Sequence, residues 1–360
     1  MKRKKIVIIG LLGKKANLYY TIGLANACAQ KHETYLVLPE HADTSSFSNK
    51  VKIITIKAPP TIIGTINNSL SLRHKEIIKE IKKINPEIIH FVWNHPFNIY
   101  YASKLKNYKI FWTCHDPEFH SGESFKIRTL GDLAVHKYFF SNADKIFVHG
   151  EKFKKYLVSK KINSNRIVSI MHGALESATP YGDKKIKSDK NTFLFFGRIE
   201  KYKGLDTLLK AIPFVLEKHE SAKLVIAGSG DLKSYKKLFA SSIIRNLEIH
   251  NKFVSDPELA DFFRRSSFVV LPYKDATQSG VVPVAYSFKK AVIATDVGAL
   301  SDAVIDGKTG YLVERDDEVA LAEKILIMLN NPKKTKQMGI YAHKWMKREL
   351  DWSRIVEKLY

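Results

Sequence analysis

Short apolar runs alternate with stretches of helical periodicity along the chain. The runs are rich in Val, Ile and Phe and are bounded by polar residues or glycine, as buried strands of parallel sheets are. We expect strands at 6–9, 34–38, 51–56, 88–92, 110–113, 145–148, 167–170, 192–196, 223–227, 247–250, 268–271, 291–295 and 311–313. We expect helices at 17–30, 72–84, 152–159, 205–218, 231–240, 257–265, 281–288, 318–330 and 335–360. The alternation predicts the α/β class, with doubly wound parallel sheets covered by helices.

A change in composition interrupts this pattern at residues 174–191. The stretch has few large apolar residues and contains Pro180, Gly182 and a cluster of lysines, which is typical of a linker. We therefore expect four parts: a Rossmann-like domain at 1–173, the linker, a second such domain at 192–334, and a C-terminal helix at 335–360. The length of 360 residues agrees with two domains. Two such domains facing each other would place a ligand cleft at the carboxyl ends of their strands.

The charge balance is strongly basic. The chain has 59 Lys and Arg against 36 Asp and Glu, a formal net charge of +23, which suits nucleic acid, an anionic membrane surface or anionic small substrates. Only 11 of the 59 are Arg, the residue that makes the commonest base-edge contacts, and no basic stripe with interleaved aromatics is evident. We therefore expect no nucleic-acid partner. Residues 1–180 hold 28 Lys and Arg and 13 Asp and Glu, so the first half carries most of the excess.

Segment 72–84 leaves two interpretations open. Its four isoleucines fall on one helical face with lysines elsewhere, a pattern that suits either an interfacial helix on anionic lipid or, as we favour, an ordinary helix with its isoleucines in the core. No apolar run reaches the roughly 18 residues needed to span a bilayer, and run 6–9 is too short for a signal peptide. The two cysteines exclude a disulfide framework. We expect a cytoplasmic protein, with peripheral contact on the inner face of the plasma membrane as an open alternative.

The best candidate site follows strand 192–196. The strand ends at Gly197, a short loop presents Arg198 and Lys203, and Gly204 opens the next helix. Such a turn directs free backbone N–H groups at an anion, and the two cations add charge. The loop therefore suits a diphosphate, with an ordinary basic loop as the alternative.

Three further turns carry candidate binding residues. They are Gly10 and Gly13 after strand 6–9, Gly228 and Gly230 after strand 223–227, and Thr277, Gln278, Ser279 and Gly280 before helix 281–288. Neither glycine pair has the spacing of a P-loop or of a full dinucleotide fingerprint, so a plain tight turn is the alternative for each. The third turn offers polar groups where an anion is favoured, or a simple helix cap.

Polar side chains also follow strand 110–113. His115 could donate a hydrogen bond to a substrate hydroxyl or a leaving group, with Asp116 orienting its ring. His120 and Glu123 lie close by, but the spacing of these four residues fits no standard ligand pattern. We therefore expect no metal site.

At this point the chain resembles a known family. In order, the matching segments are Gly197-Arg198-x4-Lys203-Gly204-Leu205-Asp206, the turn at 227–230, residues 291–300 and the segment 306–313. Together they resemble the C-terminal domain of the GT-B family 4 glycosyltransferases over about residues 192–331. The first half is similar more loosely, through His115-Asp116 and residues 143–150, and His172 stands where the family has the Asn of a Pro-Asn-Gly.

The resemblance implies a retaining, metal-independent glycosyltransferase that extends a glycan or lipid-linked acceptor in surface polysaccharide synthesis. It implies a UDP- or GDP-sugar as co-substrate, bound mainly by the second domain, and no further cofactor. Arg198 and Lys203 match the diphosphate-binding pair, and His115 matches the histidine that contacts the transferred sugar. We expect Asp116, His120, Glu123 and His172 as further sugar or acceptor contacts. The last helix would cross back to the first domain.

One departure from the family pattern bears on function. Ala276 and Val284 stand where the family carries two glutamates, the second of which contacts the donor ribose. Neither side chain can hydrogen-bond a hydroxyl, so Gln278 and Ser279 are the candidates to replace them. The alternative function is a non-catalytic nucleotide-sugar-binding partner in a glycan assembly complex.

Overall fold

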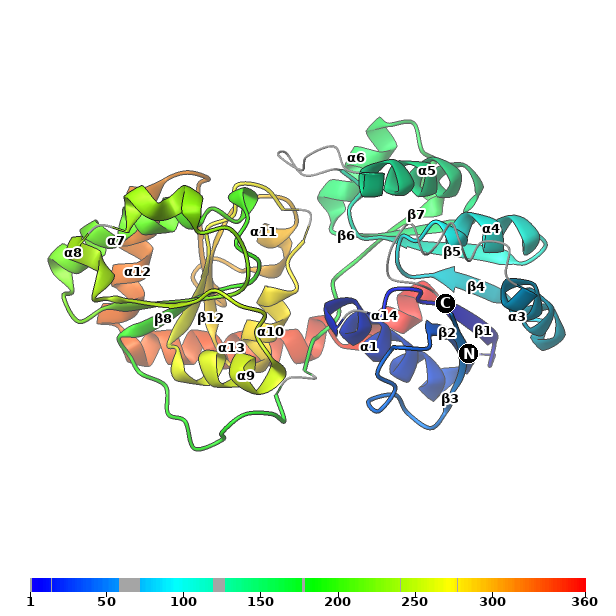
Figure 1. Ribbon diagram of the computed structural model, residues 1–360, viewed down its shortest axis with the longest axis horizontal. Helices are drawn as coiled ribbons and strands as arrows, with labels where there is room; N and C mark the ends of the chain where they lie inside the picture. The colour runs from blue at the N-terminus through cyan, green and yellow to red at the C-terminus, as the bar shows by residue number, and fades with distance from the viewer. Residues whose placement is uncertain are drawn as a thin grey trace. The chain divides into compact units, whose positions relative to one another are not determined.

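The computed structural model describes residues 2–13, 15–57, 72–118, 127–176, 179–239, 241–276 and 278–360. Within these residues the chain packs as two compact units (Figure 1). The first unit contains the described residues up to 173 together with Trp352–Tyr360, and the second contains Ala174–Asp351. Each unit is a parallel sheet with helices packed on it, which confirms the α/β class and the two Rossmann-like sheets.

The sheet of the first unit has the strand order β3-β2-β1-β4-β5-β6-β7, with every pair parallel. Its strands are β1 (Lys5–Ile9), β2 (Glu33–Pro39), β3 (Val51–Ile56), β4 (Ile88–Phe91), β5 (Lys109–Cys114), β6 (Lys145–His149) and β7 (Ile167–Ile170). Its helices are α1 (Lys15–Lys31), α3 (Leu72–Ile84), α4 (Phe97–Lys104), α5 (Ile127–Asn142), α6 (Glu151–Ser159), the 3₁₀ helix η1 (Ser164–Arg166) and α14 (Trp352–Leu359). The chain order reverses between β1 and β4, where doubly wound sheets bind ligands at the carboxyl ends of their strands.

The sheet of the second unit has the order β10-β9-β8-β11-β12-β13, again all parallel. Its strands are β8 (Thr192–Phe196), β9 (Lys223–Ala227), β10 (Leu247–His250), β11 (Phe268–Leu271), β12 (Ala291–Thr295) and β13 (Gly310–Val313). Its α-helices are α7 (Leu205–Lys218), α8 (Ser241–Ile244), α9 (Asp256–Arg265), α10 (Val281–Ser287), α11 (Leu300–Ala303), α12 (Glu318–Asn330) and α13 (Pro332–Glu349), with 3₁₀ helices η2 (Lys201–Lys203) and η3 (Lys233–Leu238). Here the order reverses between β8 and β11, so the loops that follow these two strands form the expected ligand edge.

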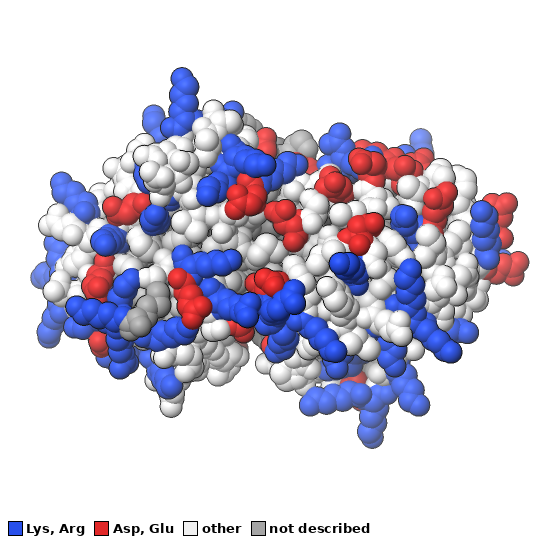
Figure 2. Space-filling model, turned by 180° about the vertical axis from the view of Figure 1, so that it is seen from behind, with Lys and Arg blue, Asp and Glu red and all other residues white. Residues whose placement is uncertain are grey.

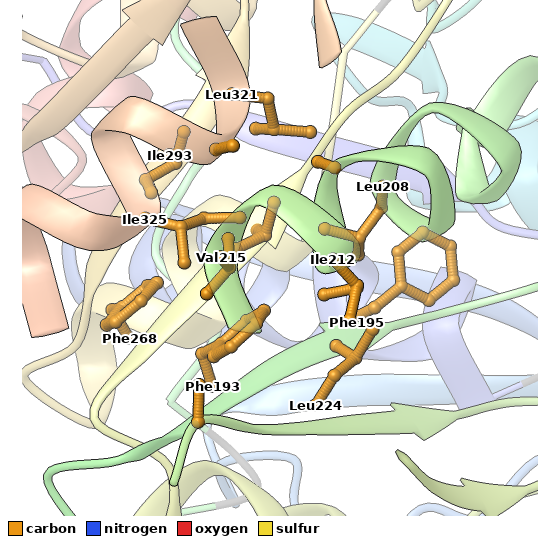
Figure 3. Close-up of a cluster of buried hydrophobic side chains, with 14 of the residues drawn as sticks. Phe193, Phe195, Leu208, Ile212, Val215, Leu224, Phe268, Ile293, Leu321 and Ile325 are labelled. Carbon is orange, nitrogen blue, oxygen red and sulfur yellow. The ribbon is translucent and has the colours of Figure 1, made fainter. Parts of the chain in front are cut away.

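An apolar core lies beneath this edge. Phe193 and Phe195 of β8 pack against the apolar face of α7, where Ile212 and Val215 are buried, and Ile325 of α12 closes the same cluster (Figure 3). A fully buried side chain of this size contributes roughly 1.5–3 kcal/mol relative to an exposed one. The loops after β8 and β11 therefore extend from a well-packed core.

Two expected helices differ from the structure. Residues 233–238 form a 3₁₀ helix rather than an α-helix over 231–240, because the carboxylate of Asp231 accepts the N–H of Lys233 (2.8 Å) and begins a tight turn. The expected helix at 335–360 is two helices. The carbonyl of Leu350 accepts the N–H of Ala174 (2.9 Å) instead of continuing the helix, so α13 stays in the second unit and only 352–360 belong to the first.

Residues 174–191 contain no helix or strand within their described part, and they pack on α9 of the second unit. Arg264 donates to the carbonyl of Thr179 (2.7 Å), and Asp261 accepts the N–H of Asp183 (2.7 Å). These hydrogen bonds hold the expected linker against the second unit.

The helix at 72–84 buries its isoleucines. Ile77 and Ile81 are 0% exposed, Ile78 is 7% exposed and Ile84 is half-buried, so the apolar face packs in the core, as the favoured interpretation has it. Lys and Arg side chains are spread over the whole face of the molecule seen in Figure 2, with Asp and Glu between them. Among the described helices, none combines the length and the apolar character required to cross a membrane.

Candidate active site

The loop after β8 is shaped by two glycines with positive φ. Gly197 has φ 126° and Gly204 has φ 65°, and a Cβ on Gly204 would lie 1.7 Å from the carbonyl oxygen of Pro272. Only glycine adopts this conformation so close to another backbone. Between the two, Arg198 is exposed, pairs with Glu200 (2.8 Å) and donates to the hydroxyl of Tyr202 (3.1 Å). The loop therefore presents its guanidinium to solvent in an ordered position.

Lys203 is a cation held by aromatic rings. Its ammonium nitrogen lies 3.8 Å from the ring centroid of Tyr273 and 4.9 Å from that of Tyr202. Among the described residues no carboxylate forms a salt bridge with it, and burial lowers its pKa. A partly buried ammonium without a carboxylate partner favours the binding of an anion.

The two glycine turns of the second unit lie side by side. Gly197 donates to the carbonyl of Ala227 (3.0 Å), and Ile199 donates to that of Ser229 (2.9 Å). A Cβ on Gly228 would lie 1.8 Å from the carbonyl oxygen of Gly197. Gly230 is held by Asn251, whose side chain bonds both its N–H (3.0 Å) and its carbonyl (3.1 Å). These contacts place the turn at 227–230 against the loop that carries Arg198.

The loop after β11 completes the same edge. Tyr273 is fully buried, and its hydroxyl hydrogen-bonds Ser279 (3.3 Å), whose oxygen also accepts the N–H of Val281 (3.3 Å). The side-chain oxygen of Gln278 is buried and has no hydrogen-bond partner among the described residues. Gly280 precedes α10 with an ordinary φ of −63°, and Thr277 lies outside the described residues. Ser279 therefore has a hydrogen bond within the loop, whereas the side-chain oxygen of Gln278 has no hydrogen-bond donor among the described residues.

A salt-bridge cluster that the sequence analysis missed braces this loop. Lys274 pairs with Asp206 of α7 (2.6 Å) and with Asp316 (2.8 Å), and Asp316 also accepts from Thr207 (3.2 Å). The match of Asp206 to the family motif was a possible signal, but the partner of that carboxylate depends on the fold. The loops after β8 and β11 are thereby fixed to one helix.

In the first unit, three histidines and an indole meet at the carboxyl edge of the sheet. His115, which follows β5, stacks on Trp93 with ring centroids 3.8 Å apart and an interplanar angle of 7°. Its Nε2 lies 3.0 Å from the carbonyl oxygen of Val92, and its Nδ1 lies 3.1 Å from Nε2 of His149. The ring of Tyr20 makes T-shaped contacts with both imidazoles. Burial lowers the pKa of His115 and His149 well below the usual value, so both rings are neutral near pH 7.

This arrangement corrects one expectation. The ring of His115 is oriented by Val92 and His149, not by Asp116, whose side chain is exposed. His120 and Glu123 lie outside the described residues, so their suggested contacts and the four-residue metal alternative stay untested.

His172 lies beside this pair, and the glycines after β1 lie on the same edge of the sheet. Nδ1 of His172 lies 3.0 Å from the carbonyl oxygen of Gly173, its ring packs against Tyr20, and burial lowers its pKa to about 4. Gly10 donates to Val37 (3.0 Å), and a Cβ on Gly13 would lie 2.7 Å from His41. Gly13 therefore allows the loop to approach its neighbour closely.

Two family models match the chain. The model described as "Glycosyltransferase Family 4" matches residues 19–174, and the one described as "Glycosyl transferases group 1" matches residues 182–345. The first of these matches falls on the first unit and the second falls on the second unit. Between them the two models account for most of the chain.

Individual relatives agree. An uncharacterized glycosyltransferase of Methanocaldococcus jannaschii is 32% identical over 61% of this chain and 59% of its own length. The capsular polysaccharide biosynthesis glycosyltransferase CapM of Staphylococcus aureus is 28% identical over 49% of this chain and 46% of its own length. The chain thus spans three fifths or less of these two relatives.

Solved structures show the same fold. Sucrose-phosphate synthase from Thermosynechococcus elongatus has a TM-score of 0.74 at 20% identity, covering 99% of this chain and 97% of that one. HepE of Anabaena, solved with UDP-glucose, has a TM-score of 0.70 at 15% identity, covering 99% and 98%. From its two family matches, its relatives and its fold, the chain belongs to the GT-B family 4 glycosyltransferases, a family of transferase enzymes.

Proposed function

We propose that the protein is a retaining, metal-independent glycosyltransferase. It transfers a sugar from UDP- or GDP-sugar to a glycan or lipid-linked acceptor in surface polysaccharide synthesis. The loops after β8 and β11 hold the donor diphosphate, and His115 contacts the transferred sugar. The retaining course and the donor class rest on the family, and the relative CapM and the structure of HepE with UDP-glucose support the acceptor and donor classes.

The observation that carries the proposal is the environment of the Lys203 ammonium. Its ammonium lies on the face of Tyr273, with no carboxylate bridge among the described residues, beside a turn that presents Arg198. When the glycosidic bond to the donor breaks, negative charge develops on the leaving diphosphate. Two cations fixed at that position stabilise the transition state without reorganisation, the task that a divalent metal performs at other diphosphate sites.

Gln278 is the proposed replacement for the glutamate that contacts the donor ribose. Its side-chain oxygen is buried with no donor in the described part of the chain, and an unsatisfied buried acceptor costs about 1–3 kcal/mol. A ribose hydroxyl can donate to that oxygen and relieve the cost. Ala276, at the position of the first glutamate, is 3% exposed and offers no polar group.

The test is a transfer assay with a panel of nucleotide sugars, in which the released nucleoside diphosphate is measured. Replacing both Arg198 and Lys203 by Ala should remove about 2 kcal/mol or more of transition-state stabilisation, roughly a thirtyfold fall in kcat/KM. Lys201→Ala, on the exposed side of the same turn, is the matched control and should leave kcat/KM unchanged. Equal loss in the control, or none in the double variant, would refute the diphosphate assignment.

Calorimetry separates transfer from mere binding. A non-catalytic nucleotide-sugar-binding partner would bind a nucleotide sugar and release no diphosphate with any acceptor. Turnover of any donor excludes that alternative. Gln278→Leu should weaken binding of the nucleotide sugar, whereas Gln278→Glu should retain it.

We also propose that the first unit contacts an anionic membrane surface, through lysines rather than through an apolar helix. At the amino-terminal edge of the first sheet, five cations line a hollow of about 520 Å³ together with two carboxylates and Asn85. The cations are Arg3, Lys4, Lys5, Lys50 and Lys52. Lys5 and Lys50 bond neutral oxygens, of Ile84 (3.4 Å) and Gln30 (3.1 Å), so their charges stay available. Polybasic surfaces of this kind bind anionic lipid at roughly 1 kcal/mol per cation near the surface.

Vesicle sedimentation tests this contact. The protein should bind vesicles containing phosphatidylglycerol and not pure phosphatidylcholine vesicles, and the binding should fall with salt. Arg3→Ala with Lys50→Ala should weaken it, whereas Lys152→Ala with Lys155→Ala, on exposed positions of α6, removes the same charge elsewhere. Equal weakening by both pairs would show that net charge alone acts.

A further inference from the structure

Three parallel strands bring their terminal histidines together. His115 follows β5, His149 ends β6 and His172 lies just beyond β7, and these strands are neighbours in the sheet. His115 and His149 are 6% and 2% exposed. The resemblance to the family assigns a sugar-contacting role to His115 and none to His149. In the structure, the two rings are hydrogen-bonded to each other.

The hydrogen bonds run in one direction. The carbonyl of Val92 can only accept, so Nε2 of His115 carries a proton and donates to it (3.0 Å). In a neutral ring, Nδ1 then has a lone pair and must accept. Its neighbour at 3.1 Å is Nε2 of His149, which therefore carries the proton of that bond.

The far nitrogen of His149, Nδ1, is buried and makes no hydrogen bond of ordinary geometry among the described residues, although the backbone of Ile170 lies close enough to raise the pKa of this ring. A lone pair left without a donor costs less than a buried N–H left without an acceptor would, and in a neutral ring with Nε2 protonated Nδ1 is that lone pair. The stacked indole of Trp93 and the ring of Tyr20 pack against the ring of His115 and restrict its rotation.

We propose that His149 is a positioning residue that keeps His115 in the Nε2-protonated tautomer. This inference rests on the proposed function of His115. An imidazole in this tautomer can donate to a sugar hydroxyl from Nε2 by exchanging one acceptor, the carbonyl of Val92, for another. Without a donor at Nδ1, only the carbonyl of Val92 still favours a proton on Nε2, and a fraction of the rings can carry the proton on Nδ1, with Nε2 accepting instead of donating.

Three variants separate tautomer control from simple packing. His149→Phe preserves an aromatic ring and removes the donor. His149→Gln places an amide N–H near the position of Nε2 and should restore donation. His74→Phe is the control, because His74 is also buried in the first unit but bonds Tyr101 (2.7 Å) and not the cluster.

The readout is nitrogen-15 NMR of histidine-labelled protein, with His115 assigned by its absence in His115→Asn. The wild-type protein and His149→Gln should show His115 protonated at Nε2 alone, and His149→Phe should show both tautomers. In transfer assays, kcat/KM of His149→Phe should fall about tenfold or more, as with other partners that fix an imidazole tautomer. His149→Gln and His74→Phe should stay close to wild type.

The outcomes are distinct. A wild-type His115 protonated at Nδ1, or an unchanged tautomer in His149→Phe, overturns the inference even if that variant loses activity. The wild-type spectrum decides the first point should His149→Phe fail to fold. A shifted tautomer with full transfer activity overturns the link to catalysis. If no donor is turned over by the wild-type protein, the proposed function fails, while the spectra still decide what His149 does.

Discussion

The ammonium of Lys203 lies 3.8 Å from the ring centroid of Tyr273, closer to that ring than to the ring of Tyr202. Tyr273 is itself fixed, because it is fully buried and its hydroxyl bonds Ser279. The aromatic face attracts the cation without neutralising it. Under the proposed function, Lys203 is thus held in place before the donor diphosphate binds.

Replacing Tyr273 by Leu should weaken the binding of UDP or GDP about threefold to tenfold, since a partly desolvated cation–π contact contributes ~1 kcal/mol. Tyr273→Phe keeps the ring and loses only the bond to Ser279, so its affinity should remain near that of the wild type. Isothermal calorimetry measures both. Equal weakening in the Phe and Leu variants would attribute the effect to the hydroxyl instead.

Gly228→Ala should destabilise the second unit by about 2 kcal/mol or more, because its Cβ would meet the carbonyl oxygen of Gly197 at a φ of 149°. Gly307→Ala provides the comparison. Gly307 also has a positive φ, 70°, but nothing lies within 4 Å of its Cβ, so only the backbone strain of about 1 kcal/mol is expected. Urea unfolding of both variants tests the difference, which disappears if the steric contact is irrelevant.

Lys290 should make the stability of the protein depend on pH in the alkaline range. It is 8% exposed, and burial lowers its pKa from 10.5 to about 8. Below about pH 8 the ammonium is charged in both states, and the folded state bears the cost of burying it. Above the unfolded value of 10.5 it is neutral in both, and the cost is gone.

Lys290→Met should therefore raise the free energy of unfolding by ~2 kcal/mol at pH 7. The gain should shrink between pH 8 and 10.5 and vanish above that range. Lys289→Met, at the exposed neighbouring position, should change little at either pH. A gain of the same size at pH 7 and at the alkaline end would contradict a titrating origin.

Gly23 and Trp352 should be energetically coupled. A Cβ on Gly23 would lie 2.1 Å from the indole nitrogen of Trp352, so Gly23→Ala should displace α14 and destabilise the first unit. Combining it with Trp352→Leu should recover part of the loss, with a coupling energy of about 1–2 kcal/mol in a double-mutant cycle. Gly131→Ala, whose nearest neighbour is Pro96 at 3.8 Å, should be neutral or slightly stabilising. If the losses in the free energy of unfolding simply add, the indole of Trp352 is not what opposes a Cβ at Gly23.

Local pattern was sufficient for the strands. Each expected strand lies within one residue of the observed bounds, because a strand buried on both faces needs a short run of Val, Ile or Phe and little else. The end of α13 was not predictable in this way. It depends on a bond between Leu350 and Ala174, which are remote in sequence.

The candidate site shows the same contrast between features of the local sequence and contacts that depend on the fold. Arg198 and Lys203 lie in one contiguous motif, so the sequence could indicate them. The partners of these residues could not be read from the chain. Tyr273 reaches Lys203, and His149 reaches His115, only because β11 neighbours β8 and β6 neighbours β5. Asp116, adjacent to His115 in sequence, was the wrong choice for the residue that orients its ring.

Helix α14 has a consequence for how the chain folds as it is synthesised. It packs on α1, and Ile355, Val356 and Leu359 are buried in the core of the first unit (Figure 1). Domains tend to fold in the order in which they leave the ribosome. Here the second unit can acquire its full core while the first, translated earlier, still lacks these side chains. The unit made first is therefore the unit completed last, because its core lacks Ile355, Val356 and Leu359 until these residues have been synthesised.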